Sequence, residues 1–250
     1  MNAKKIGKEG NSLTILVNGT HAQFVNAIRR TVMKSVPGLA IEDISIYRND
    51  SVLFDEFLGS RLGSLPLKAG SKLKKGDKAK LVLHEKGPKT VYAADIKSKT
   101  AGVEVVAKDT PIAKLKEGQE LKLEMEALMG TGGEHVKWQP AIVSYKELPE
   151  IKGKTAKVKN AQQVVDSCPK KVLEVKAGRV VLKDPYGCTL CGYCEESSGG
   201  QLELEPSQSA FVLTVETFGQ RKALELLEEA CDLLKQKTTD FQSEASKKLK

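Results

Sequence analysis

Aromatic side chains are scarce in this sequence, where Phe, Trp and Tyr together make up 5% of the residues. Basic residues outnumber acidic ones by 40 to 32, which gives a formal net charge of +8. Nucleic-acid-binding domains usually gather such charge on one face, next to a recognisable motif or to aromatic residues on which bases stack. Here the lysines are spread along the whole chain and no such motif accompanies them. A solvated, lysine-rich surface is therefore favoured over direct contact with DNA.

Long apolar segments are also missing. No apolar run approaches the ~18 residues that a membrane-spanning helix needs, and the start, MNAKKIGKEG, lacks the apolar segment of a signal peptide. We therefore expect a cytoplasmic protein without membrane contact. The five cysteines do not form the pattern of a disulfide framework, because three of them lie between Cys188 and Cys194.

No set of residues typical of a catalytic site is evident. The three histidines, His21, His84 and His135, are scattered and have no obvious acidic or cysteine partner in the sequence. The glycine-rich stretch GTGGEH lacks the Lys-Ser/Thr of a phosphate-binding loop, so a plain turn is favoured there. No run of aspartates could hold catalytic magnesium. We expect no catalytic residues in this chain.

The first part of the chain predicts a strand followed by an amphipathic helix. Leu13, Ile15 and Val17 alternate, as in a half-buried strand that Asn18-Gly19 closes. In the helix, an apolar residue recurs every four positions, with Thr20 and Gln23 as a capping box and Pro37-Gly38 as the end. The apolar stripe of this helix consists of Phe24, Ile28, Val32 and Val36, widened by Val25 and Met33.

The middle of the chain reads as mostly β structure. Alternating segments at 78–86, 89–96, 103–115 and 119–130 are separated by turn residues, and a further strand is expected to carry the single Trp138. The stretch DEFLGSRLGSLPL reads as a loop bounded by Gly and Pro, and the polar, basic segment 151–163 as a linker.

Two further strands are expected in 201–219, and a helix at the C-terminal end. The apolar stripe of this last helix is Ala223, Leu224, Leu227, Ala230, Cys231 and Leu234. Cys231 lies on that stripe, so core packing is the favoured explanation for it.

The stretch DPYGCTLCGYCEESS carries the chemistry of this sequence. Cys188, Cys191 and Cys194 follow the two-residue spacing of a bacterial ferredoxin, but Ser198 stands where the fourth cysteine would be. Upstream, Cys168 is followed by Pro169. In two-cluster ferredoxins, the cysteine before proline binds the cluster opposite to that of its own triplet. Here the first motif retains only its Cys-Pro, and the second motif retains only its triplet. By that rule, the four remaining cysteines bind one and the same cluster.

Four cysteine thiolates suit iron–sulfur chemistry because they are soft anionic donors. The sequence therefore predicts one 4Fe–4S cluster on Cys168, Cys188, Cys191 and Cys194, with a strand–turn–strand segment between the two motifs. Gly187 and Gly192 would permit the tight loop. A zinc ion on the same four residues is the less favoured alternative, since zinc sites usually pair two C-x-x-C units. Free or merely structural thiols also remain open.

Several motifs in one order carry a family resemblance. Four motifs occur along the chain in this order: NAIRR, VPGLAIE, DEFLGSRLGSLPL and EHVKWQPA. With them, the chain resembles the α-type assembly subunits of multisubunit RNA polymerases, and with the cysteine region it resembles their archaeal, iron–sulfur-containing D-type members.

The resemblance implies an α+β fold in three parts. These are a dimerisation domain from 1–42 and 208–250, a mostly β insert domain from 43–154 and 201–207, and an inserted ferredoxin-like 4Fe–4S domain from 155–200. It also implies a non-catalytic subunit of a nucleotidyltransferase complex. Such a subunit would pair with the small α-like subunit L and form the platform for the second-largest and largest polymerase subunits.

Partner-binding residues follow from the same resemblance. The helix stripes would meet an equivalent pair on the partner through Phe24, Ile28, Val32, Leu224 and Leu227. Within DEFLGSRLGSLPL, Arg61 is the candidate anchor for the second-largest subunit, and a salt bridge from Arg61 to Asp55 or Glu56 is the equally weighted alternative. A ferredoxin-type electron-transfer protein with an appended domain is the competing function, but the sequence offers no flavin motif and at most one cluster.

Overall fold

The computed structural model describes residues 1–69, 76–152 and 157–248. The border expected at 154–155 therefore lies outside the described residues. The chain divides into two compact units. The first consists of Met1–Gly7, Thr14–Asn26 and Ser144–Thr214, and the second of Lys8–Leu13, Ala27–Val143 and Val215–Lys250.

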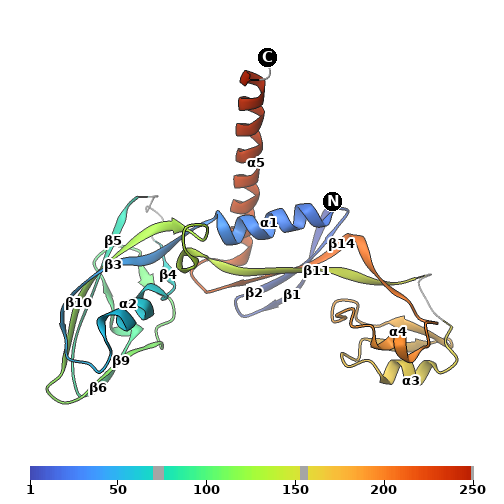
Figure 1. The fold of residues 1–250 in the computed structure, drawn as a ribbon, viewed down its shortest axis with the longest axis horizontal. Helices are drawn as coiled ribbons and strands as arrows, with labels where there is room; N and C mark the ends of the chain where they lie inside the picture. The colour runs from blue at the N-terminus through green and yellow to red at the C-terminus, as the bar shows by residue number, and fades with distance from the viewer. Residues whose placement is uncertain (70–75, 153–156, 249–250) are drawn as a thin grey trace. The chain divides into compact units, whose positions relative to one another are not determined.

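Most residues of a four-stranded sheet belong to the first unit. Its order is β1-β2-β14-β11, and its strands are β1 (Asn2–Glu9), β2 (Ser12–Asn18), β14 (Leu204–Thr217) and β11 (Ala141–Ile151) (Figure 1). The strand expected at 13–17 is confirmed. The sequence had not indicated β1, because this edge strand exposes nearly all of its polar and basic side chains. The two strands expected in 201–219 are one, since the strand continues past Pro206.

Helix α1 (Ala22–Lys34) confirms the first predicted helix but corrects its details. It begins at Ala22, so His21 and not Thr20 directly precedes it, and the capping box expected at Thr20 is wrong. Val25, Ile28 and Val32 are buried inside this chain alone, whereas Phe24 is 40% exposed. Ile28 and Val32, which were expected to contact a partner, are therefore enclosed without one. The chain itself covers them.

The second unit contains a six-stranded sheet in the order β7-β5-β10-β3-β4-β8. Two antiparallel pairings of β10 place apolar residues in register: Leu123 lies opposite Leu83 on one side and Ile46 on the other. Alternate residues of β5 and β10 fill the core, as the period of two in their sequences predicts. The strands are β3 (Pro37–Asn49), β4 (Leu67–Lys68), β5 (Lys78–Lys86), β7 (Lys97–Ser98), β8 (Glu104–Val105) and β10 (Glu120–Thr131).

A second, two-stranded sheet pairs β6 (Lys89–Tyr92) with β9 (Pro111–Leu115). A 3-10 turn, Ala93–Asp95, follows β6. In this turn the Asp95 carboxylate accepts the amide N–H of Tyr92 at 2.8 Å and the Lys89 ammonium at 3.0 Å. Val91, Ile112 and the strands of the larger sheet belong to one apolar core.

The segment expected to be a loop, DEFLGSRLGSLPL, contains a helix. Helix α2 spans Asp55–Gly63 and buries Leu58 and Leu62 completely. These two leucines are four residues apart and lie on one face of the helix. Gly59 and Gly63 suggested a loop, but the core contacts of Leu58 and Leu62 outweigh the low helix propensity of glycine.

Trp138 lies in a 3-10 turn, Val136–Trp138, and not on a strand as expected. Its indole N–H donates to the carbonyl of Leu128 at 3.0 Å. Gly130 of β10 lies opposite Gly38 of β3, and an added Cβ at either glycine would collide with Trp138. The glycine-rich stretch is thus used for close packing around Trp138.

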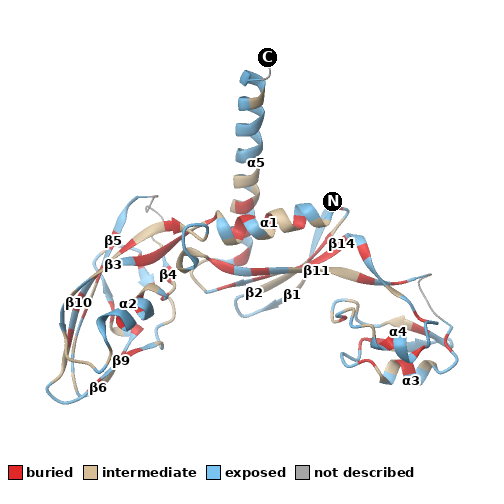
Figure 2. Ribbon diagram, viewed as in Figure 1, coloured by how far each residue is buried: buried red, intermediate tan, exposed pale blue. Residues whose placement is uncertain are grey.

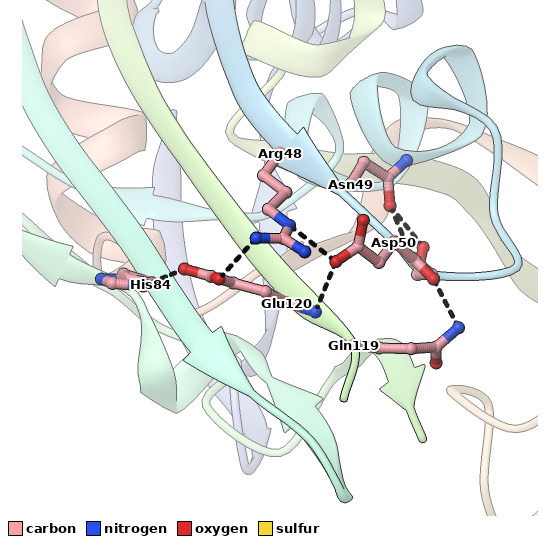
Figure 3. A network of polar contacts seen from close by, with 7 residues as sticks. Arg48, Asn49, Asp50, His84, Gln119 and Glu120 are labelled. Carbon is pink, nitrogen blue, oxygen red and sulfur yellow. Dashed lines mark hydrogen bonds and ion pairs between the residues drawn. The ribbon is translucent and has the colours of Figure 1, made fainter. Parts of the chain in front are cut away.

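A network of polar side chains joins the ends of β3, β5 and β10 (Figure 3). Arg48 donates to Asp50 at 2.7 Å and to Glu120 at 3.2 Å, and His84 lies 2.7 Å from Glu120. The hydrogen bond with His84 is the main reason why the pKa of Glu120 is below its ordinary value. His84 has no obvious acidic partner in the sequence, but it contacts Glu120 because β5 and β10 are paired strands.

Helix α5 (Ala223–Lys248) confirms the last predicted helix. Its buried residues are Ala223, Leu226, Leu227 and Ala230, and from Lys235 to Glu244 every side chain is exposed (Figure 2). Leu224, expected on the apolar stripe, is 59% exposed, and Leu226 takes the buried position. Cys231 is half-buried, and burial raises the pKa of its thiol. None of the helices in the described ranges is long and apolar enough to cross a membrane.

Candidate metal–thiolate site

The four predicted ligand cysteines lie on a small α/β substructure within the first unit. The strand–turn–strand predicted between them is confirmed: β12 (Leu173–Lys176) pairs antiparallel with β13 (Arg179–Leu182). The two turn residues, Ala177 and Gly178, both have positive φ angles, as a tight hairpin turn requires. Helices α3 (Ala161–Asp166) and α4 (Tyr193–Ser197) complete the substructure (Figure 1). The segment 151–163 was expected to be a linker. Its described residues from 157 to 163 include the start of α3.

The triplet loop turns sharply twice. Leu190 and Gly192 have φ angles of 52° and 79°, the left-handed conformation that reverses the backbone between successive cysteines. At Gly187, an added Cβ would lie 2.6 Å from the Asp184 carboxylate and 3.0 Å from Val172. The expectation that Gly187 and Gly192 permit a close loop is confirmed.

The four predicted ligands surround one cavity. Cys168, Cys188, Cys191 and Cys194 all line it, together with an apolar wall that includes Leu173. Cys168, Cys188 and Cys194 are buried and Cys191 is exposed, and none is in a disulfide. The structure therefore brings the Cys-Pro motif and the triplet together, which the sequence could predict only from the ferredoxin rule.

The four thiols line one cavity and have the donor chemistry of a metal–sulfur centre. As the side chains stand, the described part of the chain holds no group of three or more His, Cys, Asp or Glu side chains gathered as around a metal ion. Burial raises the pKa of the Cys194 thiol to about 11, and the neighbouring Cys168 and Cys188 add to the rise. The Cys194 thiol is therefore protonated near neutral pH, and binding of a metal to it would release a proton.

Ser198, in the position of the missing fourth cysteine, is buried and has a structural role. Its hydroxyl donates to the carbonyl of Glu195 at 2.7 Å and accepts the amide N–H of Leu202 at 3.0 Å. Both bonds fix the end of α4. Ser198 is not among the residues that line the cysteine cavity.

One contact to the triplet loop was not expected from the sequence. The ammonium of Lys146, on β11, donates to the carbonyl of Tyr186 at 2.6 Å and to that of Cys188 at 2.8 Å. Lys146 is forty residues upstream of Tyr186, and no sequence signal marks one lysine among so many as a loop contact.

The predicted partner-binding residues fall into two groups. Phe24 and Leu224 are exposed, while Ile28, Val32 and Leu227 are buried within the chain. Arg61 is exposed on α2, and its guanidinium donates to the carbonyls of Pro111 and Ile112 at 3.2 and 3.4 Å. These main-chain contacts take the place of the salt bridge to Asp55 or Glu56 that was the alternative for Arg61.

Comparison with known proteins supplies the family. Residues 42–144 match the model of the RNA polymerase Rpb3/RpoA insert domain. The chain is 33% identical to DNA-directed RNA polymerase subunit Rpo3 of Methanosphaera stadtmanae, over 96% of this chain and 97% of the relative. The chain belongs to the archaeal Rpo3 family.

Two further Rpo3 proteins show the same extent of similarity. The subunit of Methanothermobacter thermautotrophicus is 34% identical, over 92% of this chain and 93% of its own length. That of Pyrococcus furiosus is 31% identical, over 96% and 95%. The resemblance to α-type polymerase subunits is thus confirmed, and a ferredoxin-type electron carrier is not favoured. The Rpo3 match extends across the cysteine substructure.

Proposed function

We propose that this Rpo3-family chain is the non-catalytic assembly subunit of an archaeal DNA-directed RNA polymerase and pairs with a small α-like subunit of the L type. The heterodimer would form the platform for the second-largest and largest subunits. Family membership supports the polymerase role. Support for the pairing comes from α5, which exposes every side chain from Lys235 to Glu244, including Phe241 at 74%. Most helical stability in proteins comes from tertiary packing, and this length of helix receives little from its own chain.

The pairing can be tested at residues that the chain does not need for its own core. Leu224→Asp on α5 should leave the isolated chain folded, because Leu224 is 59% exposed, but should weaken co-elution with the small subunit in gel filtration after co-expression. Val136→Asp, at a residue 68% exposed on the 3-10 turn, is the matched control and should not change co-elution. Full co-elution of the Leu224→Asp chain would remove Leu224 from the interface.

The same proposal includes docking of the second-largest subunit on α2, with Arg61 as its polar anchor. Arg61 is exposed and its position is fixed by the two carbonyl contacts, which support a preorganised role. Arg61→Ala should reduce binding of the second-largest subunit to the preformed heterodimer. Lys68→Ala, at an exposed lysine paired with Glu104, is the control. Equal binding by both variants would reject Arg61 as the anchor.

We further propose that Cys168, Cys188, Cys191 and Cys194 hold one 4Fe–4S cluster. The single observation that supports it is the cavity lined by all four side chains. When bound, the cluster would supply metal–thiolate bonds that link the Cys168 turn to the triplet loop. Chain purified without oxygen should contain about four irons and four inorganic sulfides. One zinc per chain without sulfide would favour the zinc alternative, and absence of both metals would reject a metal site.

The role of the cluster is proposed to be structural. The substructure around it has a small core of its own, whose buried members include Val164, Val180 and Leu202 as well as three of the cysteines. Small cores of this kind usually depend on added cross-links or metals. In the double variant Cys188→Ser/Cys191→Ser, we expect faster hydrogen exchange in the described residues from 157 to 200, with pairing retained. Unchanged exchange there would contradict a structural role, and global unfolding would show that the cluster stabilises the whole subunit.

A further inference from the structure

Lys146 makes a contact that neither the family nor the cysteine motif accounts for. Its ammonium donates to the carbonyls of Tyr186 and Cys188, at 2.6 and 2.8 Å. These two carbonyls flank Gly187, where an added Cβ would lie 2.6 Å from the Asp184 carboxylate. A single side chain on β11 therefore fixes both ends of the tripeptide that leads into the triplet.

The charge of Lys146 has no carboxylate partner within ion-pair distance among the described residues, and the side chain is half-buried. Hydrogen bonds from a charged donor are stronger than neutral ones, so two of them hold the loop firmly. Negative charge close to this half-buried ammonium would add an electrostatic attraction. Four cysteine thiolates with a metal–sulfur core would form an anionic group next to the Cys188 carbonyl.

We infer that Lys146 is a positioning residue for the cysteine site: it sets the position of Cys188 through the backbone and provides a fixed positive charge beside the thiolates. The inference rests on the proposed function in that its electrostatic part requires a bound cluster. Its geometric part requires only the two hydrogen bonds. The two parts predict different measurements, which allows them to be tested separately.

A fixed cation beside a cluster favours the reduced state, which carries one more negative charge, and so raises the reduction potential. Replacing Lys146 by an uncharged side chain should lower that potential. Loss of the two hydrogen bonds should also free the backbone before Cys188, so that in metal-free chain the buried Cys188 thiol reacts faster with an alkylating reagent.

The experiment compares Lys146→Met, Lys146→Arg and the control Lys176→Met in full-length chain. Lys176 lies on β12 of the same substructure, is exposed and pairs with Glu174, so its loss changes the net charge equally. We expect a lower cluster potential and faster Cys188 alkylation in Lys146→Met, substantial recovery of the potential in Lys146→Arg, and wild-type values in Lys176→Met.

The outcomes separate the two hypotheses. A potential that is equal in wild type, Lys146→Met and Lys176→Met would overturn the electrostatic part, and unchanged alkylation of Cys188 would overturn the positioning. If the wild type contains no iron or sulfide, the proposed cluster fails, while the alkylation rates still decide whether Lys146 positions Cys188. If Lys146→Met does not fold, Lys146→Gln, which removes the charge but keeps a polar side chain, replaces it in both measurements.

Discussion

The amide of Leu202 donates a hydrogen bond to the hydroxyl of Ser198 at 3.0 Å, and both residues are buried. The serine that interrupts the ferredoxin pattern thus terminates a helix and satisfies a backbone donor of the small core. Ser198 stands at the position where the ferredoxin pattern would have its fourth cysteine, and here its hydroxyl has a structural role.

Ser198→Ala should destabilise the cysteine substructure by about 1–3 kcal/mol, because a buried amide loses its acceptor. Hydrogen exchange of the segment around α4 is the measurement. Ser197→Ala is the control, since Ser197 precedes it on the same helix and is exposed. Equal exchange in the two variants would show that the Leu202 amide finds another acceptor.

Gly130→Ala should destabilise the second unit by about 1–3 kcal/mol, because the new methyl group would overlap the Trp138 ring. Gly59→Ala on α2 is a matched glycine change in open space, with no atom within 4 Å of the added Cβ. It should raise stability by about 0.5–1 kcal/mol through better helix propensity. Urea unfolding followed by tryptophan fluorescence measures both, and two changes of the same sign would contradict this account of the glycines.

Ile28→Asp should unfold or strongly destabilise the isolated chain, by about 3–5 kcal/mol, since Ile28 is buried and the variant would place a carboxylate in an apolar position. Phe24→Asp, one turn earlier and 40% exposed, should leave the isolated chain stable. Thermal unfolding of each chain alone, before any pairing assay, separates loss of fold from loss of partner. Comparable stability of the two variants would mean that Ile28 is less enclosed than the structure indicates.

Asp95→Asn should remove part of the acid sensitivity of the second unit. Burial raises the pKa of Asp95, but hydrogen bonds from the Tyr92 amide and Lys89 outweigh it, so the pKa lies below its ordinary value. The ionised carboxylate therefore stabilises the fold at pH values above the ordinary pKa of aspartate. This stabilisation is lost as the pH falls through the lowered pKa of Asp95. The urea unfolding midpoints of wild type and variant should differ at pH 7 and converge at pH 3. A constant difference between them would contradict the assignment.

Much of the secondary structure and the family could be predicted from the residues alone. Periodicity located β2, α1, β5, β10 and α5, because alternation and the 3.6-residue repeat are imposed by burial of one face. Cysteine spacing selected four residues that line one cavity. The ordered motifs pointed to the polymerase α-type family, which the Rpo3 relatives confirm.

Tertiary structure decided what local patterns leave open. Whether α1 buries Val25 or Phe24 depends on which side of the helix meets the core, and adjacent apolar residues do not settle that. Leu58 and Leu62 make α2 a helix despite its glycines, because core contacts exceed the propensity cost. The pairing of His84 with Glu120, and the reach of Lys146 to the carbonyls before the triplet, join residues far apart in sequence. Such contacts follow from strand register and chain topology, and no local pattern encodes them.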